Sequence, residues 1–168
     1  SDVLCVQEYG QGMCEGGVFP FGNGVLLKGL GSTMMRHSAI ILHAKWRHRW
    51  SNLIVMGKFV SVDLMYESIV LRVVCAHMPS HHSCRDYARA LLHLEHLISL
   101  PSLDIGYSGK PIMCILGIDA NEGLSPSFDS PSDPITQFVG GHTTGRRGPC
   151  SVLFSEFVHS GGFVATNT

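Results

Sequence analysis

The dominant pattern along the chain is a series of short apolar runs separated by Gly, Ser or Pro. Runs of this length, rich in Val, Ile, Leu and Phe, are typical of β-strands. The strands predicted in this way are Val3–Gln7, Ala39–His43, Phe59–Leu64, Ile69–Ala76, Ile112–Ile118 and Phe163–Ala165. Only a short turn near Tyr66–Ser68 separates the third strand from the fourth, which predicts a hairpin. The run Cys114–Ile118 holds only apolar residues and glycine, which predicts a strand buried on both faces.

A period of three to four residues marks two helices. Between Arg85 and Leu97 the apolar residues recur at helical steps, which predicts an amphipathic helix. Ser83 is the expected N-cap of this helix, and Pro101 is expected to stop it. A second, shorter helix is predicted at Val152–Val158, where two glycines follow and close it.

Length and composition narrow the class of protein. The chain has 168 residues, of which 45% are hydrophobic and 15% charged, as in a globular domain with a sizeable core. Two segments rich in Gly, Ser and Pro, Gly10–Gly24 and Ser125–Arg147, are predicted to be surface loops. The expected fold class is therefore α/β with one core, in a single domain over residues 1–168. No apolar run approaches the roughly 20 residues of a membrane span, so no membrane partner is expected.

Charge and cysteine usage add expectations about the surroundings of the protein. The net charge of −1 does not predict a large electropositive surface. Six cysteines, at positions 5, 14, 75, 84, 114 and 150, include no Cys-x-x-Cys pair. This scatter favours a reducing, intracellular compartment, either cytoplasmic or nuclear, over a disulfide framework. No signal-peptide pattern is visible, and the chain begins without Met inside a strand-like run, so we expect a fragment.

Polar side chains stand at the carboxyl ends of three predicted strands. Gln7–Glu8 end the first strand, His77 ends the fourth, and Asp119 and Asn121 end the fifth. Reactive groups collect at such ends because strands are rigid while the following loops vary. A carboxylate, an imidazole and an Asp-x-Asn pair suit metal-assisted attack on a phosphate ester. The carboxylate holds Mg²⁺, the imidazole shares a proton, and Asp and Asn orient water and anionic oxygens.

In this order the motifs resemble the endonuclease/exonuclease/phosphatase superfamily, the deoxyribonuclease I-like group that includes retrotransposon endonuclease domains. The stretch 76-AHMPS-80 is similar to the family strand that ends in His or Tyr close to Pro. The stretch 117-GIDAN-121 is similar to the family's Gly-Asp-Phe-Asn, with Ile118 inserted and Ala120 in place of Phe. The last stretch, 151-SVLFSEFVHSGGFVATNT-168, is similar to the retrotransposon-type segment in which a helix leads to a strand.

The resemblance implies a layered β-sandwich of two mixed sheets flanked by helices (α+β), and divalent-metal-dependent hydrolysis of phosphodiesters. Glu8 would be the ligand of Mg²⁺ or Mn²⁺, and His77 would be the catalytic imidazole. Asp119 and Asn121 would orient the attacking water and contact the scissile phosphate. Arg146–Arg147, in 145-GRRG-148, lie where relatives carry basic residues and would bind the substrate, a nucleic acid or another phosphoester.

Two segments of the family pattern have no counterpart in these residues. Members carry an Asn on a strand that would precede Ser1, and further strands with an Asp and a final Asp-His pair that would follow Thr168. We therefore expect a domain cut at both ends and inactive by itself. One alternative is a non-catalytic binding module of the same fold, and another is a redox or zinc protein that uses the cysteines. DNA, RNA and other phosphoester substrates, and the oligomeric state, stay open.

Each candidate residue also has a structural interpretation. Asp119 and Asn121 favour an Asx-turn after a strand. Glu8, taken alone, is typical of a carboxylate in a solvated loop. His77 also fits a structural role, as a histidine held by hydrogen bonds. Glu122 is expected to be exposed beside the site without being a ligand.

Two further stretches mix residue types that suggest binding. The stretch 75-CAHMPSHHSC-84 holds two Cys and three His, but a zinc site needs four converging ligands. Cys75 is expected in the core, and the adjacent His81 and His82 do not converge easily on one ion. The stretch 45-KWRHRW-50 interleaves basic and aromatic residues, as nucleic-acid surfaces do. We favour the other interpretation, a surface loop or strand edge with its Trp residues packed inward.

Overall fold

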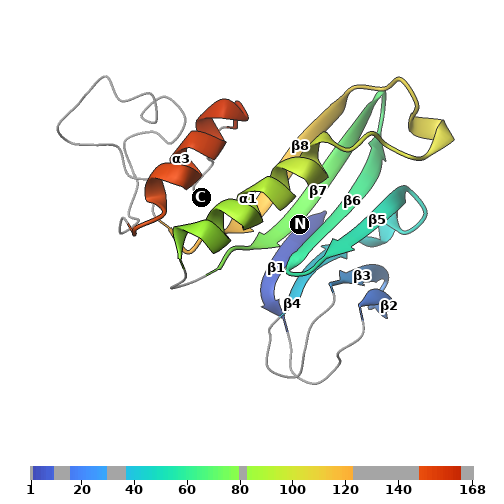
Figure 1. The fold of residues 1–168 in the computed structure, drawn as a ribbon. Helices are drawn as coiled ribbons and strands as arrows, with labels where there is room; N and C mark the ends of the chain where they lie inside the picture. The colour runs from blue at the N-terminus through green and yellow to red at the C-terminus, as the bar shows by residue number, and fades with distance from the viewer. Residues whose placement is uncertain (1, 10–15, 30–36, 80–82, 123–147, 164–168) are drawn as a thin grey trace. The chain divides into compact units, whose positions relative to one another are not determined.

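The computed structural model describes residues 2–9, 16–29, 37–79, 83–122 and 148–163 (Figure 1). The chain divides into two compact units, residues 1–78 with 94–119, and residues 79–93 with 120–168. Helix α1 (Cys84–Ser99) contributes its first turns to the second unit and its last turns to the first. The prediction of a single domain stays a prediction.

The first sheet of the first unit is antiparallel. Its order is β1 (Val3–Tyr9), β4 (His37–Leu42), β3 (Gly24–Lys28) and β2 (Gly17–Phe21). The prediction that both sheets are mixed is wrong for this one, because all its described pairs run antiparallel. The loop prediction for residues 10–24 is also wrong at β2, an edge strand of five residues. Pro20 within it suggested a loop, but an edge strand tolerates a residue that cannot donate a ladder hydrogen bond.

The second sheet is mixed and carries the predicted hairpin. Its order is β5 (Trp50–Met56), β6 (Phe59–Tyr66), β7 (Ile69–His77) and β8 (Ile112–Asp119). Tyr66 pairs with Ile69, so β6 and β7 are joined by a two-residue turn in which Glu67 has a φ of 51°. β7 and β8 are parallel, as the crossover through α1 allows. The described residues thus confirm an α+β chain with two four-stranded sheets.

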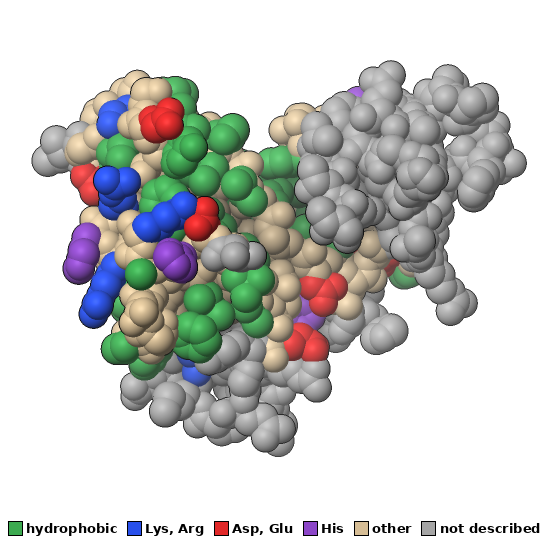
Figure 2. Space-filling view, turned by 180° about the vertical axis from the view of Figure 1, so that it is seen from behind, with side chains coloured by type: hydrophobic (Ala, Val, Ile, Leu, Met, Phe, Trp, Pro, Cys, Tyr) green, Lys and Arg blue, Asp and Glu red, His purple; other side chains and the backbone are tan. Residues whose placement is uncertain are grey.

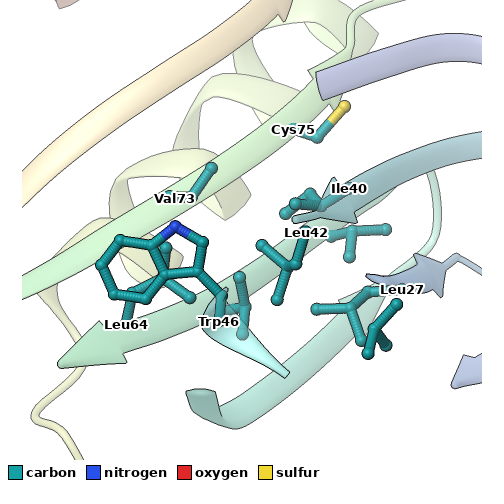
Figure 3. Close-up of a cluster of buried hydrophobic side chains, with 10 residues drawn as sticks. Leu27, Ile40, Leu42, Trp46, Leu64, Val73 and Cys75 are labelled. Atoms are coloured by element: carbon teal, nitrogen blue, oxygen red, sulfur yellow. The ribbon is translucent and has the colours of Figure 1, made fainter. Parts of the chain in front are cut away.

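The core of the first unit lies between these sheets (Figure 3). Leu27, Ile40 and Leu42 come from the first sheet, and Leu64 and Val73 come from the second. All five side chains are almost completely buried. The strands alternate inward and outward side chains, so one apolar face of each sheet is removed from water.

Strand β8 departs from its prediction, although its position agrees. Ile112, Met113 and Ile115 are all exposed, with Met113 at 53%. The prediction of a strand buried on both faces is therefore wrong. Among the described residues β8 lies at the edge of its sheet, and burial there depends on neighbours that an apolar run does not reveal.

The two helices follow the predicted pattern closely. Helix α1 begins after Ser83, whose Oγ accepts a hydrogen bond from the Asp86 amide at 3.4 Å, and it ends before Pro101. Helix α3 spans Ser151–Ser160, and Gly162 follows it with a φ of 64°. Phe163 lies outside any strand, and residues 164–165 lie outside the described residues. No described helix combines the length and apolar character of a membrane span.

Candidate active site

His77 and Asp119 come together at the carboxyl ends of two parallel strands. They are the last residues of β7 and β8 and are partners in the register. The Nε2 of His77 lies 3.9 Å from Oδ2 of Asp119, and the Met78 amide donates to the Asp119 carbonyl at 2.9 Å. His77 is 7% exposed, whereas the Asp119 side chain is 43% exposed. The pair therefore combines a buried imidazole with a carboxylate that solvent and ligands reach.

Glu8 stands at an irregularity near the end of β1. Val6 pairs with Ala39 and Tyr9 pairs with His37, so Gln7 and Glu8 together face one residue of β4. This is a β-bulge, and Glu8 adopts a left-handed φ of 57° and is exposed. Bulges redirect side chains, and non-glycine residues with positive φ are concentrated at functional sites.

Gln7 attaches the end of β1 to the other sheet. Its Nε2 donates to the Gly117 carbonyl at 2.9 Å and lies 3.6 Å from Sγ of Cys75. Gly117 is two residues before Asp119, and Cys75 is two residues before His77. The carboxyl end of β1 therefore lies beside the carboxyl ends of β7 and β8. The sequence marks Gln7 only as part of the Gln-Glu motif, and its positioning role becomes visible through these contacts with the second sheet.

Gly117 allows the close approach of β1 and β8. A Cβ atom at this position would lie 2.4 Å from Cβ of Cys5 and 2.6 Å from its Sγ. The hydrogen bond of Cys5 with Cys75 and the burial of its thiol raise the pKa of Cys5. Glycine at 117 is therefore a packing requirement of the candidate site.

Replacing Gly117 with alanine is expected to lower the free energy of unfolding by about 1–3 kcal/mol, the usual cost of overpacking. The added methyl group must push β1 away from β8, because its space is occupied by Cβ of Cys5, which is bonded directly to the β1 backbone. Urea denaturation measures the change. Gly106→Ala is the matched control, since a Cβ there meets only the Asp104 side chain at 3.3 Å. Equal stability of the two variants would contradict the expectation.

Asn121 and Glu122 belong to the second unit. Asn121 is exposed with a φ of 52°, a conformation that suits both an Asx-type turn and a redirected functional side chain. Glu122 is half-buried, so its predicted exposure is wrong. Its carboxylate accepts hydrogen bonds from the Cys150 amide at 3.3 Å and from Oγ of Ser151 at 3.0 Å. A carboxylate at the positive end of a helix stabilises it, and Glu122 therefore holds the start of α3.

The basic segment 45–50 lies at the far end of β1 from Glu8. The His43 amide donates to the Asp2 carbonyl at 3.0 Å, and Lys45 forms an ion pair with Asp2. Asp2 and Glu8 are separated by the length of β1, about 20 Å at 3.3 Å per residue. Trp46 is buried in the core and Trp50 is half-buried, which confirms the inward packing of both.

The charges near this segment are mixed in sign. Figure 2 shows a face on which Lys, Arg and His side chains lie close to acidic ones, with apolar side chains between them. Arg146 and Arg147, the predicted substrate-binding residues, lie outside the described residues.

Metal-ligating side chains do not form a zinc-like cluster in the described part of the chain. No group of three or more His, Cys, Asp or Glu residues there is arranged to hold an ion. Cys75 is buried in the core, as predicted, and His81 and His82 lie outside the described residues. Magnesium makes a smaller demand, because it binds through one or two carboxylates and keeps several waters.

Comparison of the chain with protein-family models, curated proteins and solved structures finds no match. The functional interpretation therefore depends on the residues themselves. Three of them stand at carboxyl ends of strands in the first unit: Glu8 on β1 of the first sheet, and His77 and Asp119 on the neighbouring β7 and β8 of the second. Asn121 follows two residues after Asp119.

Proposed function

We propose that this chain is a phosphoesterase domain of endonuclease type, similar to the endonuclease/exonuclease/phosphatase superfamily, that hydrolyses phosphodiester bonds with Mg²⁺ or Mn²⁺. The observation that supports the proposal is the pairing of His77 with Asp119 at two strand ends, with the end of β1 attached to the same sheet through Gln7. Glu8 projects from a bulge, and His77 and Asp119 approach to 3.9 Å. Rigid strands hold such groups with the accuracy that catalysis needs.

The residues fit a hard divalent cation. Glu8 is exposed, and the Asp119 carboxylate is 43% exposed, so both offer oxygen atoms to solvent. One or two carboxylates, with water and phosphate oxygens, are the usual ligands of Mg²⁺. Glu8 would hold the ion, and when bound the ion supplies electrostatic stabilisation of charge on the phosphoryl oxygens.

The remaining side chains act on the substrate and water. The His77 imidazole donates a hydrogen bond or a proton to a phosphate or leaving oxygen. The Asp119 carboxylate lies within ion-pair distance of Nε2 of His77. There it orients the imidazole ring and accepts a hydrogen bond from the attacking water. Asn121 contacts the scissile phosphate, and Arg146 with Arg147 binds the flanking phosphates of a nucleic acid.

The second candidate function is a non-catalytic binding module of the same fold. It is favoured by the stretch 117-GIDAN-121, in which Ile118 and Ala120 depart from the Gly-Asp-Phe-Asn of the family. The redox alternative is less suited to Cys5 and Cys75, because Cys75, whose pKa is lowered by its hydrogen bond with Cys5, is buried from dissolved oxidants, and the raised pKa of the half-buried Cys5 disfavours its thiolate.

Calorimetric titration with Mg²⁺ and Mn²⁺, followed by a hydrolysis assay, tests the proposal. Binding of one ion is expected on the chain itself. Metal-dependent cleavage of single- or double-stranded nucleic acid is expected from the longest natural polypeptide that contains residues 1–168. Binding without cleavage would replace the enzyme by the binding module. Absence of metal binding would overturn the proposal.

A further inference from the structure

Two cysteines of the second unit lie next to each other. Sγ of Cys84 is 3.2 Å from Sγ of Cys150, although 66 residues separate them in the chain. Cys84 is the first residue of α1, and Cys150 immediately precedes α3. A disulfide bond is about 2.05 Å long, so a shift of about 1.1 Å would join the two sulfur atoms.

The backbone around both cysteines is held by specific contacts. Ser83 caps α1 directly before Cys84, as described above. The Cys150 amide donates to Oε1 of Glu122. A Cβ atom at Gly148 would lie 2.3 Å from Oε2 of Glu122, so a larger residue there would displace this carboxylate from its present position. The two sulfur atoms are therefore brought together by a built arrangement of caps and hydrogen bonds.

The two thiols differ in access. Cys84 is exposed, whereas Cys150 is buried. Burial, the hydrogen bond with Cys84 and the nearby Glu122 carboxylate raise the pKa of Cys150 to about 12. Cys150 is therefore protonated at neutral pH and shielded from direct attack. A dissolved oxidant reaches Cys84 first, and Cys150 is positioned to resolve the product.

We propose that Cys84 and Cys150 form a reversible redox modification site that takes low-molecular-weight disulfides as its oxidant. Cys84 thiolate attacks one sulfur of the small disulfide, which forms a mixed disulfide and releases one small thiolate. Cys150 then loses its proton and attacks Sγ of Cys84, which forms the protein disulfide and releases the second thiolate. Two protein thiols are oxidised, one small disulfide is reduced to two thiols, and the two protein protons pass to the released thiolates.

The disulfide would link the start of helix α1 covalently to the start of helix α3. The bond closes a loop from the start of α1 to the start of α3. That loop contains β8 and Asn121, so the link is expected to lower the conformational entropy of the unfolded chain over this part of the sequence. The inference itself needs only the thiol geometry and stands or falls separately from the phosphoesterase proposal.

Equilibration of the whole chain with mixtures of reduced and oxidised glutathione tests the site. After an acid quench and alkylation, peptide mapping is expected to show one linked peptide pair that contains Cys84 and Cys150 and lacks two hydrogen atoms. Dithiothreitol is expected to reverse it. Cys114→Ser is the matched control and should leave the link unchanged, whereas Cys84→Ser should abolish it.

Three results would overturn the inference. The first is a stable glutathione adduct on Cys84 in wild-type protein with no transfer to Cys150. The second is a link from either residue to Cys14 or another cysteine. The third is stoichiometric zinc on the purified chain that protects both thiols until a chelator removes it. The peptide map of the wild-type protein is the primary readout, so a variant that folds poorly does not change whether the inference stands.

Discussion

Replacing Asp63 with alanine is expected to lower the free energy of unfolding by about 3–5 kcal/mol, the cost of leaving a buried charge without its partner. Asp63 and Arg72 face each other across the β6–β7 hairpin, and both side chains are completely buried. Two parallel hydrogen bonds join them, Nε to Oδ1 at 2.7 Å and Nη2 to Oδ2 at 2.9 Å. Without the carboxylate, the Arg72 guanidinium loses its only anionic partner among these contacts.

Arg72 also ties the sheet to the end of helix α1. Its Nη1 donates to the carbonyls of Leu97 and Ile98, each at 3.2 Å, and to that of Leu100. These carbonyls carry the negative end of the helix and have no partner within it. The double variant Asp63→Leu with Arg72→Met is expected to recover part of the loss, because no charge stays buried. The recovery should be incomplete, because three carbonyls, one of them in a fully buried contact, lose their donor.

Chemical denaturation of the wild type, Asp63→Leu, Arg72→Met and the double variant measures the coupling, and Asp63→Ala is measured beside them. Asp2→Ala is the matched control, because Asp2 and Lys45 form an ion pair at the surface with side chains 61% and 49% exposed. Exposed pairs contribute little, so this variant should unfold like the wild type. A loss for Asp63→Ala no larger than that of the control would show that the buried pair does not stabilise the fold.

Replacing Glu8 with glutamine is expected to weaken Mg²⁺ binding at least 10- to 100-fold, since even the loss of an outer-shell partner has effects of that size. The substitution keeps the size of the side chain but removes its negative charge and replaces one acceptor oxygen with an NH2 donor. Mg²⁺ prefers charged oxygen ligands, so a neutral amide at the same place should not replace the carboxylate. Calorimetry measures the affinity, and the hydrolysis rate should fall in parallel.

Glu67→Gln is the matched control for this experiment. Glu67 is also an exposed glutamate with a left-handed φ of 51°, but it lies in the turn at the start of β7, at the opposite end from His77. Its replacement should leave metal affinity unchanged. If both variants bind Mg²⁺ equally well, the metal is held elsewhere and Glu8 is not its ligand.

The predictable part of the fold is the part determined by local pattern. The β6–β7 hairpin follows from two apolar runs around a two-residue turn. Asp63 lies four residues before Glu67 and Arg72 lies four residues after Ser68, so the register of the hairpin pairs Asp63 with Arg72. Helix α1 follows from its period and from the Ser83 cap. The local pattern did not predict β2, β3 and β5, whose strand conformation depends on pairing with neighbouring strands.

The candidate site also has one part that local sequence predicts and another part that depends on contacts between distant segments. Local sequence identifies polar residues at strand ends, which is how Glu8, His77 and Asp119 were selected. It does not reveal the contact of Gln7 with Gly117, because 110 residues lie between them. It also misjudged Glu122, whose partners Cys150 and Ser151 belong to a helix far along the chain.

The sequence by itself determined the secondary-structure periods, the hairpin, the helix caps and the order of chemically suited side chains, because these depend on neighbours within a few residues. Only the tertiary structure decided which apolar runs are buried, which charges are paired and which cysteines meet. These properties arise from contacts between distant segments, whose free energy depends on the packing of the whole unit. The exposed β8, the buried Asp63–Arg72 pair and the Cys84–Cys150 pair are the clearest examples.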